Sequence, residues 1–313
     1  MNPELPSEAL DLADSAGKAF ANLGSVDLAR RAEDDPTVRT TEVQPALDAL
    51  GVHDLDPRDD PISLAAAAAL CEAAGRVALP FPLPAALVRD VDGRPTVTVP
   101  DAVARVDHGD LFDEWRVGSL AGPRGVAAHA GNRLATRLGP FVTDLEVTDD
   151  GAAIDAHDLH LQLVLTAWSV LGTVDRAVEL AVEHVNGRVQ FGKPIAAFQA
   201  VQFQLADAAV AVAGLRQLAS FTLWRLDDAP DEATADVLAL RLHALDVARS
   251  VLRTCQQLHG AAGVCDEYDI SVLTRMVQPA LRLPWSAERT VTELAAAIDR
   301  DGFVGLFPHG RPR

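Results

Sequence analysis

Apolar residues recur at helical spacing over most of the chain. In the amino-terminal part, this pattern predicts helices over residues 6–23, 41–50 and 63–77, with a polar stretch around Asp34 and Asp35. From residue 159 onward it predicts longer helices, over residues 161–185, 195–226, 232–258 and 286–298. Long antiparallel helices with short connections are typical of a four-helix bundle, so we predict a mainly α-helical protein.

The segment between residues 88 and 156 has a different pattern, in which short runs of alternating apolar and polar residues are separated by turn residues. It predicts strands over residues 96–99, 102–106, 115–117 and 141–143. The predicted turns are at residues 92–93, 108–109 and 122–123. We therefore expect a helical domain over residues 1–87, a small β domain over 88–156 and a helical bundle over 157–313.

Composition and charge narrow the classes of partner. The formal net charge of −18 disfavours nucleic acid and acidic membranes, because both would be repelled over most of the surface. Cys71, Cys255 and Cys265 form no C-x-x-C pair and leave an odd thiol, which favours a reducing compartment. The sequence has neither a signal-peptide pattern nor an apolar run that could span a bilayer, so we expect a cytoplasmic protein.

Residues 188–194, between the first two long predicted helices, gather unusual chemistry for an acidic chain. Arg188 offers a planar fork of donors that suits phosphate, Gln190 and Gln199 offer amides, and Phe191 offers a ring face. The same segment fits a plain helix–helix elbow, in which Phe191 fills the core and Pro194 starts the next helix. The pattern alone leaves both interpretations open.

This elbow resembles the R-x-x-F-G element of the acyl-CoA dehydrogenase family. A second segment, residues 256–264 with the sequence QQLHGAAGV, is similar to that family's Q-L-x-G-G-x-G turn. The two segments occur in the family's order, with helical patterning between them. The resemblance, clearest over residues 159–275, implies an amino-terminal helical domain, a reduced middle β domain and a carboxyl-terminal four-helix bundle.

The resemblance also implies flavin adenine dinucleotide (FAD) as the cofactor. In family tetramers these two elements reach a flavin that is held mainly by the neighbouring subunit. Carried over to this chain, Arg188 is implied to bind the pyrophosphate and Phe191 to lie along the flavin edge. The other implied contacts are Gln190 in the elbow and, around the adenosine, Gln199, Gln257, Gly260 and Ala261. Ala261 replaces a glycine of the family turn, and its methyl group is expected to crowd a phosphate there.

The family's catalytic base is the part that this sequence lacks. The usual glutamate follows the glycine turn, where residues 283–286 read Leu-Pro-Trp-Ser and Pro284 takes its place. Some members carry the glutamate on an earlier helix, at a position that corresponds to Gln162 or Leu163 here. None of these side chains can accept a proton as a carboxylate does. The family's T-E-P-x-A-G-S-D flavin loop is also absent, so we assign no catalytic residue.

The resemblance therefore implies a noncatalytic-type (β) subunit of an α2β2 acyl-CoA dehydrogenase. Its partner would be a catalytic subunit that binds most of the acyl-CoA, with a steroid side-chain thioester as one candidate. Two alternatives stay open: a self-sufficient dehydrogenase whose base is relocated, with Glu179, Glu267 and Glu288 as candidates, and a purely structural partner subunit. His157 and His160, at i and i+3, suit a metal only with further ligands, so no metal site is expected.

Overall fold

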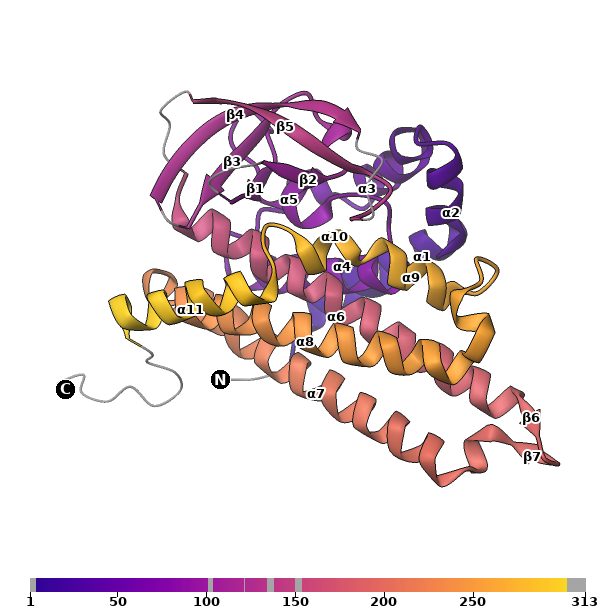
Figure 1. Cartoon of the computed structure of the whole chain (residues 1–313). Helices are drawn as coiled ribbons and strands as arrows, with labels where there is room; N and C mark the ends of the chain where they lie inside the picture. The colour runs from indigo at the N-terminus through magenta and orange to yellow at the C-terminus, as the bar shows by residue number, and fades with distance from the viewer. Residues whose placement is uncertain (1–3, 101–103, 121, 134–137, 150–153, 303–313) are drawn as a thin grey trace.

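The computed structural model describes residues 4–100, 104–120, 122–133, 138–149 and 154–302 (Figure 1). Its amino-terminal helices are α1 (Ser7–Asn22), α2 (Asp27–Asp34), α3 (Gln44–Ala49), α4 (Pro61–Arg76) and α5 (Leu83–Leu87), with a π-helical turn over Arg39–Val43. The helices predicted over residues 6–23, 41–50 and 63–77 are therefore present. Helix α2 was missed because most of its residues are charged, although Leu28, Ala29 and Ala32 are buried.

Helix α4 is buried almost all round, and the sequence fixes both its start and its closest contact. The Asp60 side chain accepts hydrogen bonds from the backbone N–H groups of Ile62 and Ser63, which caps the first turn. Further along, the backbone of α4 approaches that of α6 (Ala156–Gly187) at Gly172. A Cβ atom at Gly172 would lie 2.0 Å from the Glu72 carbonyl oxygen, so only glycine permits this approach.

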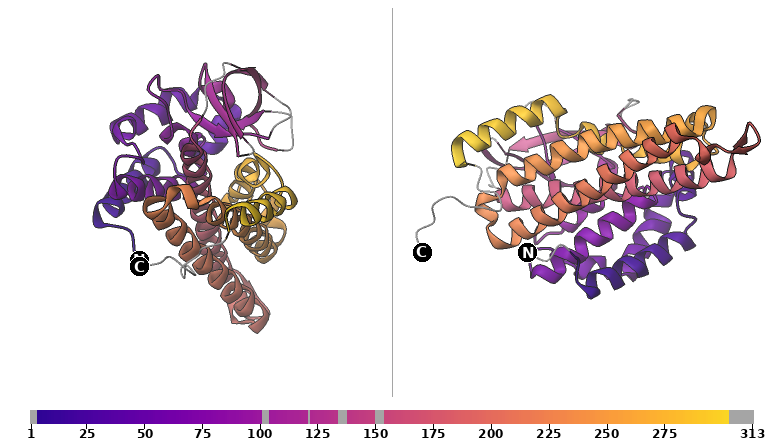
Figure 2. Two further views of the ribbon diagram at one scale, coloured as in Figure 1. Left: turned by 90° about the vertical axis from the view of Figure 1, so that its left-hand side faces the viewer. Right: turned by 90° about the horizontal axis from the view of Figure 1, so that it is seen from below.

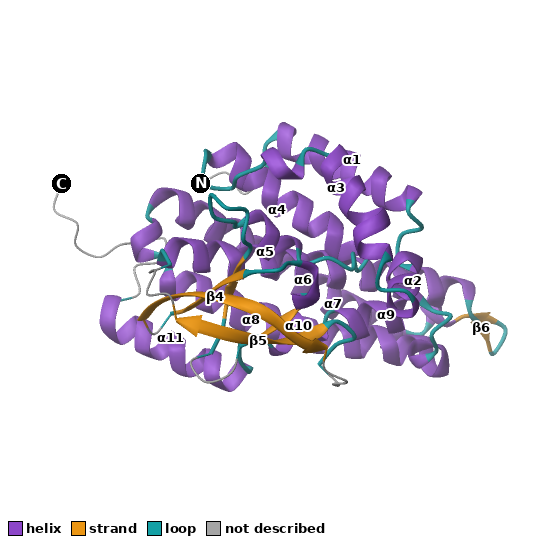
Figure 3. Cartoon of the chain, turned by 90° about the horizontal axis from the view of Figure 1, so that it is seen from above, coloured by secondary structure: helices purple, strands orange, loops and turns teal. Residues whose placement is uncertain are grey.

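The middle segment forms one sheet with the strand order β1-β3-β4-β5-β2. Its strands are β1 (Thr96–Thr98), β2 (Arg105–Asp107), β3 (Trp115–Ser119), β4 (Gly122–Arg133) and β5 (Val142–Asp149). Strands β1 and β3 are parallel, and the other pairs are antiparallel. Trp115, Val117, Val106 and Leu145 form a small core of their own. Seen from above, β4 and β5 lie over the carboxyl-terminal helices (Figure 3).

One predicted turn is wrong and one predicted strand is only partly described. Gly122 pairs with Ser119, so Gly122 and Pro123 begin strand β4 instead of forming a turn. Proline is tolerated there because the first residues of a strand need not donate to the ladder. Of the strand predicted over residues 102–106, residues 102 and 103 lie outside the described part of the chain.

The carboxyl-terminal half is built on three long helices, α6, α7 (Gln199–Asp228) and α8 (Thr234–His259), which pack on one another in pairs (Figure 2). Helix α11 (Ala287–Asp301) packs along α8. All four match the predicted helices. Two shorter helices between the glycine turn and α11, α9 (Asp269–Met276) and α10 (Gln278–Arg282), were not predicted. Helix α4 lies against α6, which joins the amino-terminal helices to the bundle.

Replacing Gly172 with alanine tests the close contact between α4 and α6. The added methyl group must push the Glu72 carbonyl away, so we expect a loss of roughly 1–3 kcal/mol in the free energy of unfolding. Chemical denaturation of the purified chain measures this. Gly17→Ala is the matched control, because a Cβ atom there meets nothing within 4 Å and should leave stability equal or slightly higher. Equal stability of the two variants would contradict the contact.

Candidate cofactor and substrate sites

The elbow of residues 188–194 forms a small projecting hairpin at one end of the bundle (Figure 1). Helix α6 ends at Gly187, and β6 (Val189–Gln190) pairs with β7 (Lys193–Pro194). The Phe191 side chain at the tip is 91% exposed, and its backbone has a φ of 52°. The prediction that Phe191 fills the core, made for a plain elbow, is therefore wrong, because the hairpin carries this ring outward.

The hairpin is held by local contacts. The Arg188 N–H donates to the His184 carbonyl (2.9 Å), and the Ile195 N–H donates to the Arg188 carbonyl (2.9 Å). Phe191 meets Phe198 edge-on with 6.2 Å between ring centroids, and the Lys193 ammonium lies 4.4 Å from the Phe198 ring centroid. These contacts leave the predicted cofactor residues of this segment, Arg188, Gln190, Phe191 and Gln199, exposed to solvent.

The glycine turn follows α8 at the same end of the bundle. Gly260 has φ 63° and ψ −137°, a conformation open to glycine and costly for other residues. A short 3₁₀ turn then covers Gly260–Val264. Gln257, Gly260 and Ala261 are exposed, and a Cβ atom at Gly260 would meet nothing within 4 Å. The surface of this turn is therefore open to a ligand.

Two histidines join the elbow to the glycine turn. His184, in the last turn of α6, stacks on His259, the last residue of α8, with 4.4 Å between ring centroids. Tyr268 meets both rings edge-on. Burial, then the nearby His259 and Arg188, lowers the pKa of His184. Sequence analysis missed this contact, whose only signal was a histidine close to each motif.

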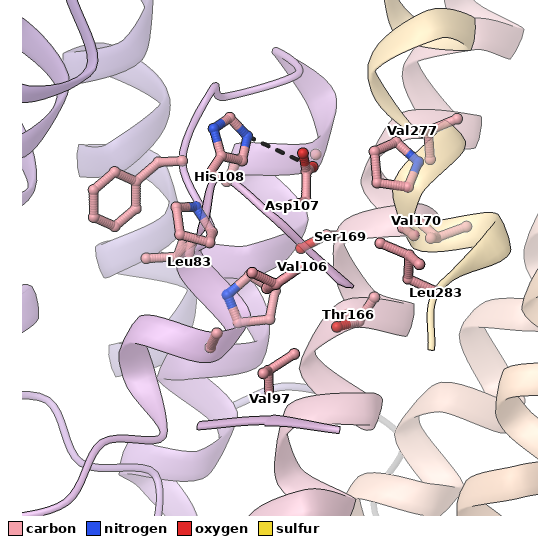
Figure 4. Close-up of a pocket in the computed structure, with 18 of the residues that line it drawn as sticks. Leu83, Val97, Val106, Asp107, His108, Thr166, Ser169, Val170, Val277 and Leu283 are labelled. Carbon is pink, nitrogen blue, oxygen red and sulfur yellow. Dashed lines mark ion pairs between the residues drawn. The ribbon is translucent and has the colours of Figure 1, made fainter. Parts of the chain in front are cut away.

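A separate cavity of about 160 Å³ lies between the sheet, α5, α6 and the α9–α10 segment (Figure 4). Most of its lining is apolar and includes Leu83, Val97, Val106, Val170, Val277 and Leu283. Gln162 and Pro284 also line it. The two positions where the family resemblance would place a catalytic glutamate are thus in the wall of one cavity.

Neighbouring groups fix both of these positions. The Gln162 Oε1 atom accepts from the Thr98 N–H (3.3 Å), and its Nε2 donates to the Thr166 hydroxyl (3.1 Å). On the other wall, Arg241 donates to the carbonyls of Leu283 (2.8 Å) and Trp285 (2.9 Å) and so holds the segment that contains Pro284. The cavity wall is therefore formed by side chains that already have defined partners.

Asp107, on β2, supplies a carboxylate to the cavity. Its Oδ2 lies 3.6 Å from the His108 Nε2 (Figure 4). The His108 Nδ1 accepts from Arg39 (3.3 Å), so the ring proton is on Nε2 and faces Asp107. Arg39 also makes a bidentate ion pair with Asp110 (2.8 and 2.6 Å). Sequence analysis had read His108 only as a turn residue, and its φ of 56° fits that reading.

None of the carboxylates proposed as a relocated base lines this cavity. Glu179 is held by Arg76 and Arg176, while Glu267 and Glu288 are exposed elsewhere. Those three assignments are therefore not supported by their positions.

The described residues contain neither a cluster suited to a metal ion nor a helix suited to a membrane. His160 is buried, and burial lowers its pKa to about 4. Among the residues that the structure describes, no group of three or more histidine, cysteine or acidic side chains could hold a metal ion. Within the same residues, every helix is too short or too polar to cross a bilayer.

Comparisons with known proteins agree on one family. Residues 149–282 match the family model "Acyl-CoA dehydrogenase, C-terminal domain". The chain is 26% identical over 213 residues to the acyl-CoA dehydrogenase IpdE2 of Mycobacterium tuberculosis, a match that spans 68% of this chain and 62% of IpdE2. Curated relatives are matched over 26–62% of their own length.

Solved structures share the fold over nearly the whole chain. The ChsE4–ChsE5 complex of Mycobacterium tuberculosis superposes with a TM-score of 0.76 at 18% identity, covering 96% of this chain and 99% of the other. An acyl-CoA dehydrogenase complexed with FAD from Bacillus anthracis has a TM-score of 0.74 at 13% identity, covering 95% and 67%. The chain is therefore similar to the acyl-CoA dehydrogenase family: residues 149–282 match its C-terminal domain, and the fold is that of solved acyl-CoA dehydrogenases.

Proposed function

We propose that this chain is the noncatalytic-type subunit of a flavin-dependent acyl-CoA dehydrogenase. It would supply contacts to the pyrophosphate and adenosine of an FAD that a catalytic partner subunit holds, in an α2β2 assembly. The observation that carries this proposal is the cavity wall, in which the two positions expected for the base are Gln162 and Pro284.

The cavity argues against proton abstraction by this chain. Oxidation of an acyl thioester needs a base that removes the α-proton while the flavin accepts a hydride from the β-carbon. An amide accepts a proton far too weakly, and proline has no basic side-chain group. The Asp107 carboxylate at the cavity lies 3.6 Å from the His108 Nε2, so it already has a neighbour of its own.

The elbow and the glycine turn fit the dinucleotide part of a flavin. Arg188 offers a guanidinium fork on an exposed hairpin, Phe191 offers a ring face, and Gly260 leaves open space beside the turn. The His184–His259 contact keeps both segments at one end of the bundle. When bound, FAD would supply the hydride-accepting chemistry, and these residues would hold its phosphates and adenosine.

Exposed apolar side chains near this end favour a partner subunit. Phe203 and Val210 on α7 are 60% and 72% exposed, and Val264 in the glycine turn is 74% exposed. Phe203 and Val210 are two helical turns apart and so lie on one face of α7, and exposed apolar surface of this kind commonly marks a protein–protein interface. The ChsE4–ChsE5 complex, which has the same fold, contains differently named chains. By analogy, the acyl-CoA would bind mainly to the partner, with a steroid side-chain thioester as a candidate.

Two other functions are distinguishable from this one. A self-sufficient dehydrogenase would need a base in its own cavity, for which Asp107 is now the candidate. A purely structural subunit would leave Arg188 without a ligand. Purifying the chain with and without its partner separates these cases, since the proposal expects flavin in the complex, with fewer flavins than subunits, and none in the isolated chain. A yellow, active assembly of this chain alone would contradict it.

Removing the Arg188 guanidinium tests its role at the phosphate. Arg188→Ala should weaken FAD retention by the complex by about 1.5–3 kcal/mol, because a charge-assisted hydrogen bond is lost. Flavin release monitored by fluorescence measures this. Arg289→Ala, which removes an exposed arginine from α11, is the control and should not change retention. Unchanged retention in Arg188→Ala would favour the purely structural role.

Replacing Asp107 with asparagine tests the relocated base. Asparagine keeps the shape and removes the charge, and we expect turnover by the complex to stay within about threefold of the unmodified protein, since general bases contribute roughly 100-fold or more. Steady-state rates with an acyl-CoA substrate, and thermal unfolding as a check on folding, provide the readout. A 100-fold loss in a folded variant would assign the base to this chain.

A further inference from the structure

A second hollow, which we call the arginine groove, lies on the other side of α10 from the apolar cavity. It measures about 570 Å³ and is formed mainly by α8 and α10. Its lining includes Arg249, Arg253 and Arg282, whereas Pro279 and Ala280 on α10 face the apolar cavity. Helix α10 is therefore a shared wall, and the two hollows differ in charge.

The arginines of the groove differ from most others in the described part of the chain. Arg76, Arg216 and Arg275, for example, each meet a carboxylate at 2.6–2.7 Å. In the described residues, Arg249 and Arg253 make no ion pair, and the groove lining contains no carboxylate. In a chain with a formal charge of −18, this is a local concentration of uncompensated positive charge.

A buried cation near the groove adds to this positive charge, and repulsion between two of the groove's arginines favours the binding of an anion. Arg241 is buried close to Arg249, and burial, followed by the charge of Arg249, lowers the pKa of Arg241 to about 10, so it stays a cation at neutral pH. Arg249 and Arg253 are four residues apart on one helix, a spacing at which like charges repel. An anion in the groove would relieve this repulsion.

The rest of the lining suits more than a bare anion. Ala248, Leu252 and Leu281 give the groove a buried apolar floor. Gln256 and Gln278 add amides, and the Arg282 guanidinium contacts only the Gln278 Oε1 (3.2 and 3.3 Å) among the described residues. Guanidinium groups bind phosphate in a bidentate manner and also stack on flat rings. We propose that the arginine groove binds a nucleoside diphosphate, with its phosphates on Arg249 and Arg253 and its base on the apolar floor.

The groove is distinct from the Arg188 site and does not depend on the proposed function. Arg253 and Gly260 are seven residues apart along α8, which corresponds to about 10 Å. Arg188 lies beyond the end of α6, on the projecting hairpin. The two phosphate sites can therefore be altered independently.

Titration of the full chain, alone and with its partner, with ADP by calorimetry tests the proposal. The double variant Arg249→Gln/Arg253→Gln should bind ADP at least about tenfold more weakly, because charge-assisted hydrogen bonds are lost. It should also show a weaker dependence of affinity on salt. Arg282→Gln alone should weaken binding to a smaller extent. Arg289→Gln/Arg300→Gln removes the same charge from α11 and should bind ADP as the unmodified chain does.

Several outcomes would overturn the proposal. One is unchanged ADP affinity in the folded Arg249→Gln/Arg253→Gln variant, and another is ADP binding that disappears only in Arg188→Ala. Equal affinity for inorganic pyrophosphate would show that the floor binds no base. If the Arg249→Gln/Arg253→Gln variant no longer bound the partner subunit but still bound ADP, the groove would instead bind an acidic segment of that subunit. If Arg188→Ala left flavin retention unchanged while the groove variant lost ADP binding, only the proposed flavin contact would be rejected.

Discussion

The contact between α4 and α6 is the constraint on which the rest of the structure depends. Gly172 on α6 brings its backbone against that of α4. Gly75 on α4 makes the reciprocal contact, because a Cβ atom there would lie 1.9 Å from the Ser169 carbonyl oxygen of α6. This approach fixes α6 relative to the amino-terminal helices. Because α6 also packs on α7 and α8, its position determines that of the whole bundle.

Helix α6 connects the two candidate sites. Gln162 in its second turn faces the apolar cavity, and His184 in its last turn holds the elbow to the glycine turn. Gln162 and His184 are about 33 Å apart along a straight helix. Such a separation fits a division in which the elbow contacts a flavin other than one at this chain's own cavity.

Much of the fold could be predicted because the long helices have strong apolar periodicity. The features that were not predicted correctly have local causes. Helix α2 is short and highly charged, and β4 begins with Gly122 and Pro123, residues that usually mark turns. Phe191 was one candidate for a core residue because it is a large apolar side chain, but the positive φ of the hairpin tip carries it outward.

The candidate site could be predicted only where the sequence resembles known motifs. Arg188 and Gly260 stand in recognisable segments, whereas the Asp107–His108 pair and the arginine groove are assembled from residues with no shared sequence signal. Arg249, Arg253 and Arg282 come together only because α10 folds back along α8. Periodicity finds elements, but it does not tell which charged residues of different elements end up without a counter-ion.

The stacked pair of His184 and His259 has a consequence for ligand binding. Because the rings join the ends of α6 and α8, the starts of the elbow and of the glycine turn are already held close together in the free chain. A ligand that bridges them would not have to immobilise either segment, so less of its interaction energy is lost to ordering entropy. The stacking of these two rings thus preorganises the segments that a bridging ligand would contact.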